Sequence, residues 1–334
     1  MQPPTLSLPA DSPINVALLV EGLEDLHALQ AFDLHPRFHL SYLVASPDFP
    51  LSKLPLDCRH SDSVPHILAD KTIHLIWLPG SSNLEHLADR IQQTLNAGKH
   101  IILGKPVEFP SPLWDRLLQT AAQAQRTINF FFPGEFNPEF QLASHVAKSG
   151  RLGRLRKIVY QYYSYSGPAL INAERPLQPI IDPLTNPGLF VTRGLEALRL
   201  LTLLHPHPTR RIFARQPNDK NLTLQLEFDD GLLAHWELAL DHPAPRNPGW
   251  YLHGSHGGYT EQAAYRIEPD GELVKTPLIQ EEIPPRSPLF RFLDHLATTL
   301  PRNEVNRSFD SLFLLANAAR SSLQTGEWET VPPQ

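Results

Sequence analysis

The sequence predicts an α/β protein of two domains. The first domain is built on a parallel sheet, and the second is an α+β domain with a large, mostly antiparallel, open sheet. Two observations predict this class. As far as residue 132, short apolar runs alternate with segments of helical periodicity, which is typical of a parallel sheet with right-handed crossovers. Beyond that point, longer strand-like segments follow one another, as expected of an antiparallel sheet.

The first domain begins with residues 14–20, an almost continuous apolar run that is typical of a strand buried on both faces. A helix over 24–34 follows, with three leucines on one side. The remaining runs predict strands over 39–45, 73–78, 100–103 and 127–132, and helices over 64–70, 83–97 and 112–125. Gly98 stands at the C′ position, where glycine commonly ends a helix.

The second domain is expected to begin near Pro133–Phe136, which gives domains of 1–133 and 134–334. A return of the final helix and tail to the first domain is left open. The turn Asp229-Asp230-Gly231 joins two strand-like runs and indicates a hairpin. The strands predicted in this domain are 155–165, 210–216, 222–228 and 232–240, and the helices are 189–204, 288–299 and 308–324.

Composition narrows the class of protein. With 41% hydrophobic and 19% charged residues, the 334-residue chain can bury a core, which excludes a disordered protein. A formal net charge of −6 gives no general attraction to nucleic acid or to an anionic membrane. The single cysteine, Cys58, excludes an internal disulfide framework and fits a reducing, cytoplasmic location. We expect no export signal and no membrane-spanning segment, because the longest apolar runs fall far short of the roughly 20 residues needed.

Several motifs then occur in a recognisable order. Residues 96–106 (NAGKHIILGKP) resemble the "AGKHVxxEKP" segment of the Gfo/Idh/MocA dehydrogenase family. Residues 150–155 (GRLGRL) are similar to its "GxIGxI" entry into the second domain, and Asn137-Pro138 lies at its "RxxP" helix start. Residues 316–328 are similar to its closing helix. The resemblance spans roughly residues 14–331 and implies a Rossmann domain followed by a domain whose open sheet face binds substrate or a second subunit.

The resemblance also implies a dinucleotide cofactor, NADP or NAD. Of the three turn glycines that such a site uses, residues 20–25 (VEGLED) keep only Gly22, and three acids lie where the diphosphate would bind. These acids argue against tight binding in the usual pose. Ser46 stands where many relatives hold the ribose with an acid, which favours NADP, although a Ser-Pro turn explains it equally well. The implied cofactor-binding residues are Gly22, Ser46, Pro79 and Lys105.

Lys105 is the candidate catalytic residue of the family motif that this sequence keeps. In the family, the lysine of "EKP" lies beside the nicotinamide and the substrate, where it polarises or helps to deprotonate a hydroxyl. The glutamate that normally precedes it is Gly104 here.

The catalytic helix departs further from the family pattern. Residues 188–199 correspond to "GxxxDxxxHxxD", but Thr192 replaces the aspartate, Glu196 the histidine and Arg199 the second aspartate. Glu196 would act as a base only with a pKa raised by burial. The acid–base pair of sugar-oxidising relatives is therefore absent, and the candidate catalytic residues are Lys105, Glu196 and Thr192.

A more distant likeness is to the biliverdin reductases, which share this fold, also lack the histidine pair and transfer hydride to a conjugated acceptor. Strand alternation places Tyr160 and Tyr162 on one face and Tyr163 and Tyr165 on the other. An aromatic sheet surface buried in a homodimer is the alternative interpretation. The candidate substrate-binding residues are Tyr163, Tyr165, Arg193 and Arg199.

The remaining histidine and glycine clusters are interpreted as structural. His205 and His207 lie in a His-Pro-His-Pro segment without an acid or cysteine at zinc spacing, so we expect turn histidines and no metal. His253 and His256 are treated in the same way. Gly254–Gly258 matches the family's "GxxG" link between strands and is expected to serve backbone geometry.

Two functions are held as near equals, so whether the chain is an enzyme is left open. The first is a divergent NAD(P)-linked oxidoreductase that acts on an unidentified small or conjugated substrate. The second is a non-catalytic descendant with a degenerate active site, which binds a small-molecule ligand or a protein partner. A conventional sugar or inositol dehydrogenase comes third. In each case we expect a homo-oligomer formed through the sheet of the second domain, and no nucleic-acid or membrane partner.

Overall fold

The computed structural model describes residues 12–20, 25–45, 58–61, 63–80, 83–165, 189–260, 263–277, 286–300 and 308–332. The chain divides into two compact units, Met1–Phe136 with Pro285–Phe309, and Asn137–Pro284 with Asp310–Gln334. The division after Phe136 lies three residues beyond the predicted boundary at residue 133. It also differs from the predicted domains because residues 285–309 group with the first unit.

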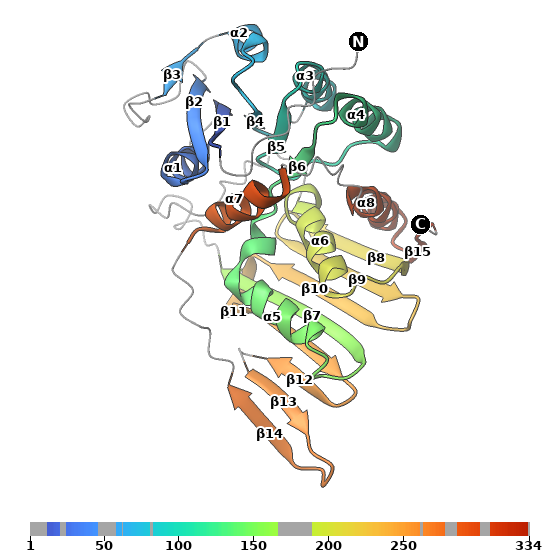
Figure 1. Cartoon of the computed structure of the whole chain (residues 1–334). Helices are drawn as coiled ribbons and strands as arrows, with labels where there is room; N and C mark the ends of the chain where they lie inside the picture. Colours follow the sequence, from blue (N-terminus) through green and yellow to red (C-terminus); the bar gives the residue numbers. More distant parts are fainter. Residues whose placement is uncertain are drawn as a thin grey trace. The chain divides into compact units, whose positions relative to one another are not determined.

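The first unit is built on a six-stranded parallel sheet in the order β3-β2-β1-β4-β5-β6 (Figure 1). Each pair of neighbouring strands in it is parallel, which confirms the predicted sheet. Strand β3 is a two-residue edge strand that the sequence did not indicate. The strands are β1 (Ile14–Val20), β2 (Phe38–Ala45), β3 (Arg59–His60), β4 (Leu75–Leu78), β5 (His100–Leu103) and β6 (Ile128–Phe130).

Helices complete the core of the first unit. Leu289, Phe292 and Leu293 of α7 join the same buried cluster as Phe32 of α1, which explains why residues 285–309 belong to this unit. The apolar faces of α3 and α4 are also buried, and Trp114 is the largest buried side chain of α4. The helices are α1 (Leu26–Leu34), α2 (Val64–Ala69), α3 (Leu84–Asn96), α4 (Ser111–Ala124) and α7 (Pro288–Thr299), with a short 3-10 helix at Pro133–Phe136.

The second unit contains a nine-stranded sheet in the order β14-β13-β12-β11-β7-β10-β9-β8-β15. Among the described strands of this sheet, only the β10–β7 pair is parallel, so the predicted mostly antiparallel sheet is confirmed. The strands are β7 (Leu155–Tyr165), β8 (Thr209–Asn218), β9 (Asn221–Phe228), β10 (Leu233–Ala239), β11 (Asp241–Gly254), β12 (Gly257–Thr260), β13 (Ala263–Ile267), β14 (Leu273–Pro277) and β15 (Glu329–Thr330).

Helices α5 (Pro138–Lys148), α6 (Leu195–Leu204) and α8 (Ser308–Thr325) cover one face of this sheet (Figure 1). Phe140 of α5 packs on Trp250 of β11, with 5.5 Å between ring centroids. Ser322 of α8 is fully buried and accepts a hydrogen bond of 2.9 Å from the Ala214 N–H of β8. The helices therefore meet one side of the sheet, and among the described residues no helix covers the other side.

Two glycines that the sequence placed at a helix end and in a hairpin turn adopt the positive φ expected there. Gly98 has a φ of 74° directly after the C-cap of α3, and Gly231 has a φ of 86° in the β9–β10 hairpin. One feature was not predicted: the segment expected to be a single helix over 189–204 contains a π-helical turn, Phe190–Gly194, before α6 begins. Such turns often occur at functional sites. Among the described residues, no helix combines the length and apolar character needed to cross a bilayer.

Candidate functional site

The topology of the first sheet indicates where a ligand would bind, at the carboxyl ends of its strands. The strand order reverses between β1 and β4, and ligands of open α/β sheets bind beyond the carboxyl ends of the strands at such a point. Strand β1 ends at Val20, and β4 ends at Leu78, which Pro79 follows directly. Pro79 therefore lies at this edge, whereas Gly22 and Ser46 lie outside the described residues.

Lys105 lies at the same edge, two residues after the end of β5. The Gly104 N–H donates a hydrogen bond of 2.9 Å to the carbonyl of Leu78, which ties this segment to the end of β4. A Cβ placed on Gly80 would lie 2.7 Å from the Cβ of Lys105, so a glycine is needed at position 80 for this approach. The structure thus places Lys105 against the segment that follows β4, at the switch point.

The position of a tryptophan accounts for the glycine at position 104, where the family that the sequence resembles has glutamate. A Cβ on Gly104 would lie 2.3 Å from Cζ2 of Trp77, a residue of β4 that is 3% exposed. The indole Nε1 of Trp77 is buried and has no hydrogen-bond partner among the described residues. The tryptophan ring fills the space that a side chain at position 104 would take. The sequence shows both residues but not their contact, which depends on the pairing of β4 with β5.

Asp25 brings a negative charge to the start of α1. It is 4% exposed, immediately precedes the helix and makes no side-chain capping hydrogen bond to it. Because β1 leads into α1, this helix start is where a Rossmann fold receives a diphosphate. A carboxylate at that place opposes a bound anion. Glu21 and Glu24 lie outside the described residues.

In the second unit, Glu196 is engaged by a neighbouring cation. Its Oε2 lies 3.7 Å from Nη1 of Arg193, and the Glu196 side chain is 13% exposed. This ion pair engages the carboxylate that the sequence places where the family has its catalytic histidine. Arg199 is half-buried one turn further along α6. Thr192 lies in the π-helical turn, with its side chain outside the described residues.

The tyrosines of β7 divide between the two faces of the sheet as alternation predicts. Tyr160 faces the helices and packs on Trp236 and Trp250, with ring centroids 5.8 and 4.6 Å away. Burial, aided by the charges of Glu139 and Glu196, raises the pKa of Tyr160 well above its usual range, so its hydroxyl stays protonated at neutral pH.

Tyr163 lies on the open face within a hydrogen-bonded chain. Its hydroxyl donates to Oε2 of Glu237 at 2.6 Å and accepts from Nε2 of Gln161 at 2.9 Å, and its ring stacks on His242. Glu237 and Gln161 are register partners across the β10–β7 pair, a signal that requires the strand pairing to be known. The side chain of Tyr165 lies outside the described residues, and the role of Tyr163 toward a substrate stays a prediction.

Comparisons with known proteins give structural matches only. No family model matches the sequence, and no curated protein sequence matches it. An oxidoreductase domain protein from Kribbella flavida is 16% identical, with a TM-score of 0.74, over 96% of this chain and 100% of that chain. Levoglucosan dehydrogenase, solved with NADH and levoglucosan, is 14% identical with a TM-score of 0.76, over 96% of this chain and 100% of that chain.

The scyllo-inositol dehydrogenase from Lactobacillus casei is 14% identical with a TM-score of 0.71, and the likeness covers 96% of this chain and 98% of that chain. At this level of identity the likeness establishes the fold. It agrees with the resemblance in the motif order of the sequence and extends over both units. The chain therefore has the fold of the Gfo/Idh/MocA-type oxidoreductases.

Proposed function

We propose that the chain is a divergent NAD(P)-linked oxidoreductase that binds its dinucleotide across the carboxyl ends of β1 and β4. The observation that carries the proposal is the position of Lys105, packed against Gly80 at the edge where the strand order reverses. The structural neighbours support it, because they include dehydrogenases, one of them solved with NADH. The proposal does not rest on the eroded glycine turn.

The described residues fit the nicotinamide half of such a cofactor better than the diphosphate half. Pro79, Gly80 and Lys105 themselves bring no carboxylate to this edge, whereas Asp25 opposes the diphosphate. When bound, the nicotinamide ring supplies a hydride donor or acceptor. Lys105 would hold or deliver a proton at Nζ beside the reacting carbon or oxygen. Without an Asp/His pair, a conjugated acceptor that needs one proton donor suits the site better than an alcohol that needs a strong base.

Binding of NADH and NADPH tests the proposal. We expect the fluorescence of either nucleotide to report saturable, submillimolar binding by the full chain. Lys105→Met should weaken it about tenfold, the effect of losing one hydrogen bond to a charged donor. Lys71→Met is the matched control, because Lys71 is an exposed lysine of the same unit, in the turn that precedes β4 at the opposite end of the sheet. A wild-type chain that binds neither nucleotide at millimolar concentration would contradict the oxidoreductase proposal.

That negative result would leave the second candidate, a non-catalytic descendant. The Arg193–Glu196 ion pair favours it specifically, because it gives the Glu196 carboxylate a structural role in place of a catalytic one. In that case, the same unit would bind a ligand or a protein partner without hydride transfer.

Removing the negative charge at the start of α1 is expected to strengthen nucleotide binding. Asp25→Asn keeps the size of the buried side chain and deletes a carboxylate close to the diphosphate. We expect Kd for NADPH to fall roughly tenfold at low salt, and less in about 0.5 M salt, because the diphosphate of the nucleotide is itself screened by salt ions. Asp33→Asn, an exposed acid in the last turn of the same helix, should leave Kd unchanged. Equal or weaker binding by Asp25→Asn would refute the repulsion.

A further inference from the structure

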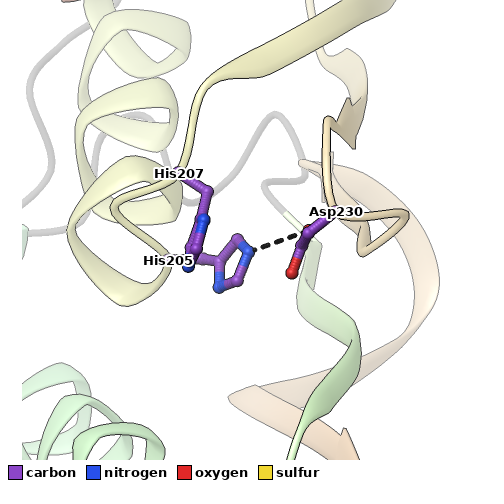
Figure 2. A group of neighbouring side chains, drawn as sticks. All are labelled: His205, His207 and Asp230. Carbon is purple, nitrogen blue, oxygen red and sulfur yellow. Dashed lines mark hydrogen bonds and ion pairs between the residues drawn. The ribbon is translucent and has the colours of Figure 1, made fainter.

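Two histidines and an aspartate converge in the second unit, where α6 ends and the β9–β10 hairpin turns. His205 directly follows α6, His207 comes two residues later, and Asp230 lies in the hairpin turn. One possible ligand atom from each of the three lies within 4.8 Å of the others. Figure 2 shows the imidazole of His205 facing the carboxylate of Asp230, with His207 beside it. These residue types, brought together in this way, are those that bind transition-metal ions.

The backbone holds the two imidazoles side by side. Pro206 and Pro208 flank His207, and each proline fixes its own φ. The His207 N–H donates a hydrogen bond of 2.9 Å to the carbonyl of His205, which closes a tight turn. The two rings are stacked, with centroids 4.3 Å apart and planes 24° from parallel. The backbone turn therefore keeps the two imidazoles close together before any ion binds.

Asp230 is fixed from the other side of the cluster. Its Oδ1 lies 3.2 Å from Nε2 of His205 and accepts a hydrogen bond of 3.2 Å from the Leu232 N–H. Its backbone carbonyl accepts a hydrogen bond from Arg154. His205 is 7% exposed, so the surrounding residues hold it in place. The cluster therefore offers an imidazole nitrogen and a carboxylate oxygen that are already in contact.

The spacing suits a small divalent ion. Zinc binds nitrogen and oxygen at about 2.0–2.2 Å, which places tetrahedral ligand atoms about 3.4 Å apart. The separation of 3.2 Å between His205 Nε2 and Asp230 Oδ1 already fits this value. The ligand nitrogen of His207 lies within 4.8 Å of the other two ligand atoms. The His207 side chain is exposed, so it can rotate to bring this nitrogen to the distance that zinc requires.

We propose that His205, His207 and Asp230 bind one divalent transition-metal ion, most favourably Zn²⁺, which clamps the end of α6 to the β9–β10 turn. Two imidazole nitrogens and one carboxylate oxygen favour zinc over Mg²⁺ or Ca²⁺, which prefer oxygen ligands alone. The ion takes the place of the proton between Nε2 and Oδ1, and the imidazole proton moves to Nδ1. Three protein ligands leave one coordination position for water. The site lies within the second unit and shares no residue with the proposed nucleotide edge of the first unit.

Zinc titration of the full chain tests this site. After chelator treatment, isothermal titration with ZnCl₂ should show one ion per chain, and the same addition should raise Tm, because an ion that binds the folded state stabilises it. MgCl₂ at the same concentration should do neither. Loss of a partner behind a ligand costs about 10–100-fold in affinity, so His207→Gln and Asp230→Asn should each weaken zinc binding by at least about 100-fold. His253→Gln, at an exposed histidine of β11, is the matched control and should bind as wild type does.

The variants are chosen to fold without the ion. His207 is exposed, and asparagine at position 230 keeps an oxygen that can accept from the Leu232 N–H. Their Tm in chelator should therefore match that of the wild-type chain in chelator. The proposal is overturned if wild type shows no stoichiometric zinc binding, or if both variants retain wild-type affinity. The His205–Asp230 contact would then be a hydrogen-bonded pair alone.

Discussion

Gly104→Ala is expected to lower the free energy of unfolding of the first unit by about 3 kcal/mol. The added methyl group would lie 2.3 Å from Cζ2 of Trp77, and the rigid indole is 3% exposed within the core. Neither group can give way cheaply, since a buried ring has no empty space to enter. Gly104→Glu, which introduces the residue found in the family that the sequence resembles, should cost more because it also places a charge against the buried ring.

Denaturant unfolding of the full chain, followed by far-ultraviolet circular dichroism, measures this effect. A double-mutant cycle with Trp77→Phe supplies the control, because removal of the outer indole atoms should relieve part of the clash. We expect Gly104→Ala to cost less in the Trp77→Phe background than in wild type. An alanine tolerated within about 0.5 kcal/mol, or the absence of coupling to Trp77, would show that the ring does not determine the residue at position 104.

Acidification is expected to destabilise the first unit steeply between pH 6.5 and pH 4. Burial lowers the pKa of His100 to about 3, whereas an unfolded histidine titrates near pH 6.5. Between these values the unfolded chain takes up a proton that the folded chain refuses. Stability therefore falls as the pH falls, by about 1.4 kcal/mol per pH unit for this group. Burial also lowers the pKa values of His35 and His74, which adds to the loss in the same direction.

The surroundings of His100 explain why it resists protonation. It is 3% exposed, and its Nδ1 accepts a hydrogen bond of 3.2 Å from the Thr127 N–H. The neutral ring therefore carries its proton on Nε2, and a second proton on Nδ1 would break this bond. Arg126, which is also buried, adds a positive charge that further opposes protonation.

Unfolding free energies measured at pH 7, 6, 5 and 4 test this effect. His100→Asn keeps an acceptor for the Thr127 N–H and should reduce the slope of stability against pH by about one proton. The exposed His39→Asn of β2 is the matched control and should leave the slope unchanged. If wild type and His100→Asn show the same slope, the buried histidine does not carry the acid sensitivity.

The sequence predicted best those strands and helices whose own residue pattern identifies them without knowledge of what they pack against. Strands 100–103 and 155–165 were predicted with the bounds of β5 and β7. The first is a short apolar run and the second a long alternating run, and both patterns are typical of strands. Helix 288–299 was also predicted to the residue, but not its place in the first unit. An amphipathic face shows that a helix is buried, whereas the residues it packs against depend on the whole fold.

The site was harder to predict than the fold because its decisive contacts join distant segments. Asp230 reaches His205 only through the β9–β10 hairpin, so spacing around the histidines alone could not indicate an acid. The contact of Trp77 with Gly104 depends on the register of β4 and β5. By contrast, Lys105 was predicted as the polar residue of the site from its motif, and the structure places it at the carboxyl edge of the sheet.

A crystal structure of the full chain with NADPH tests the central claim most directly. The account predicts the dinucleotide across the carboxyl ends of β1 and β4, with the nicotinamide beside Nζ of Lys105 and the diphosphate displaced from Asp25. Nucleotide density elsewhere on the chain would contradict it. So would crystals that contain none at a concentration that saturates a related dehydrogenase.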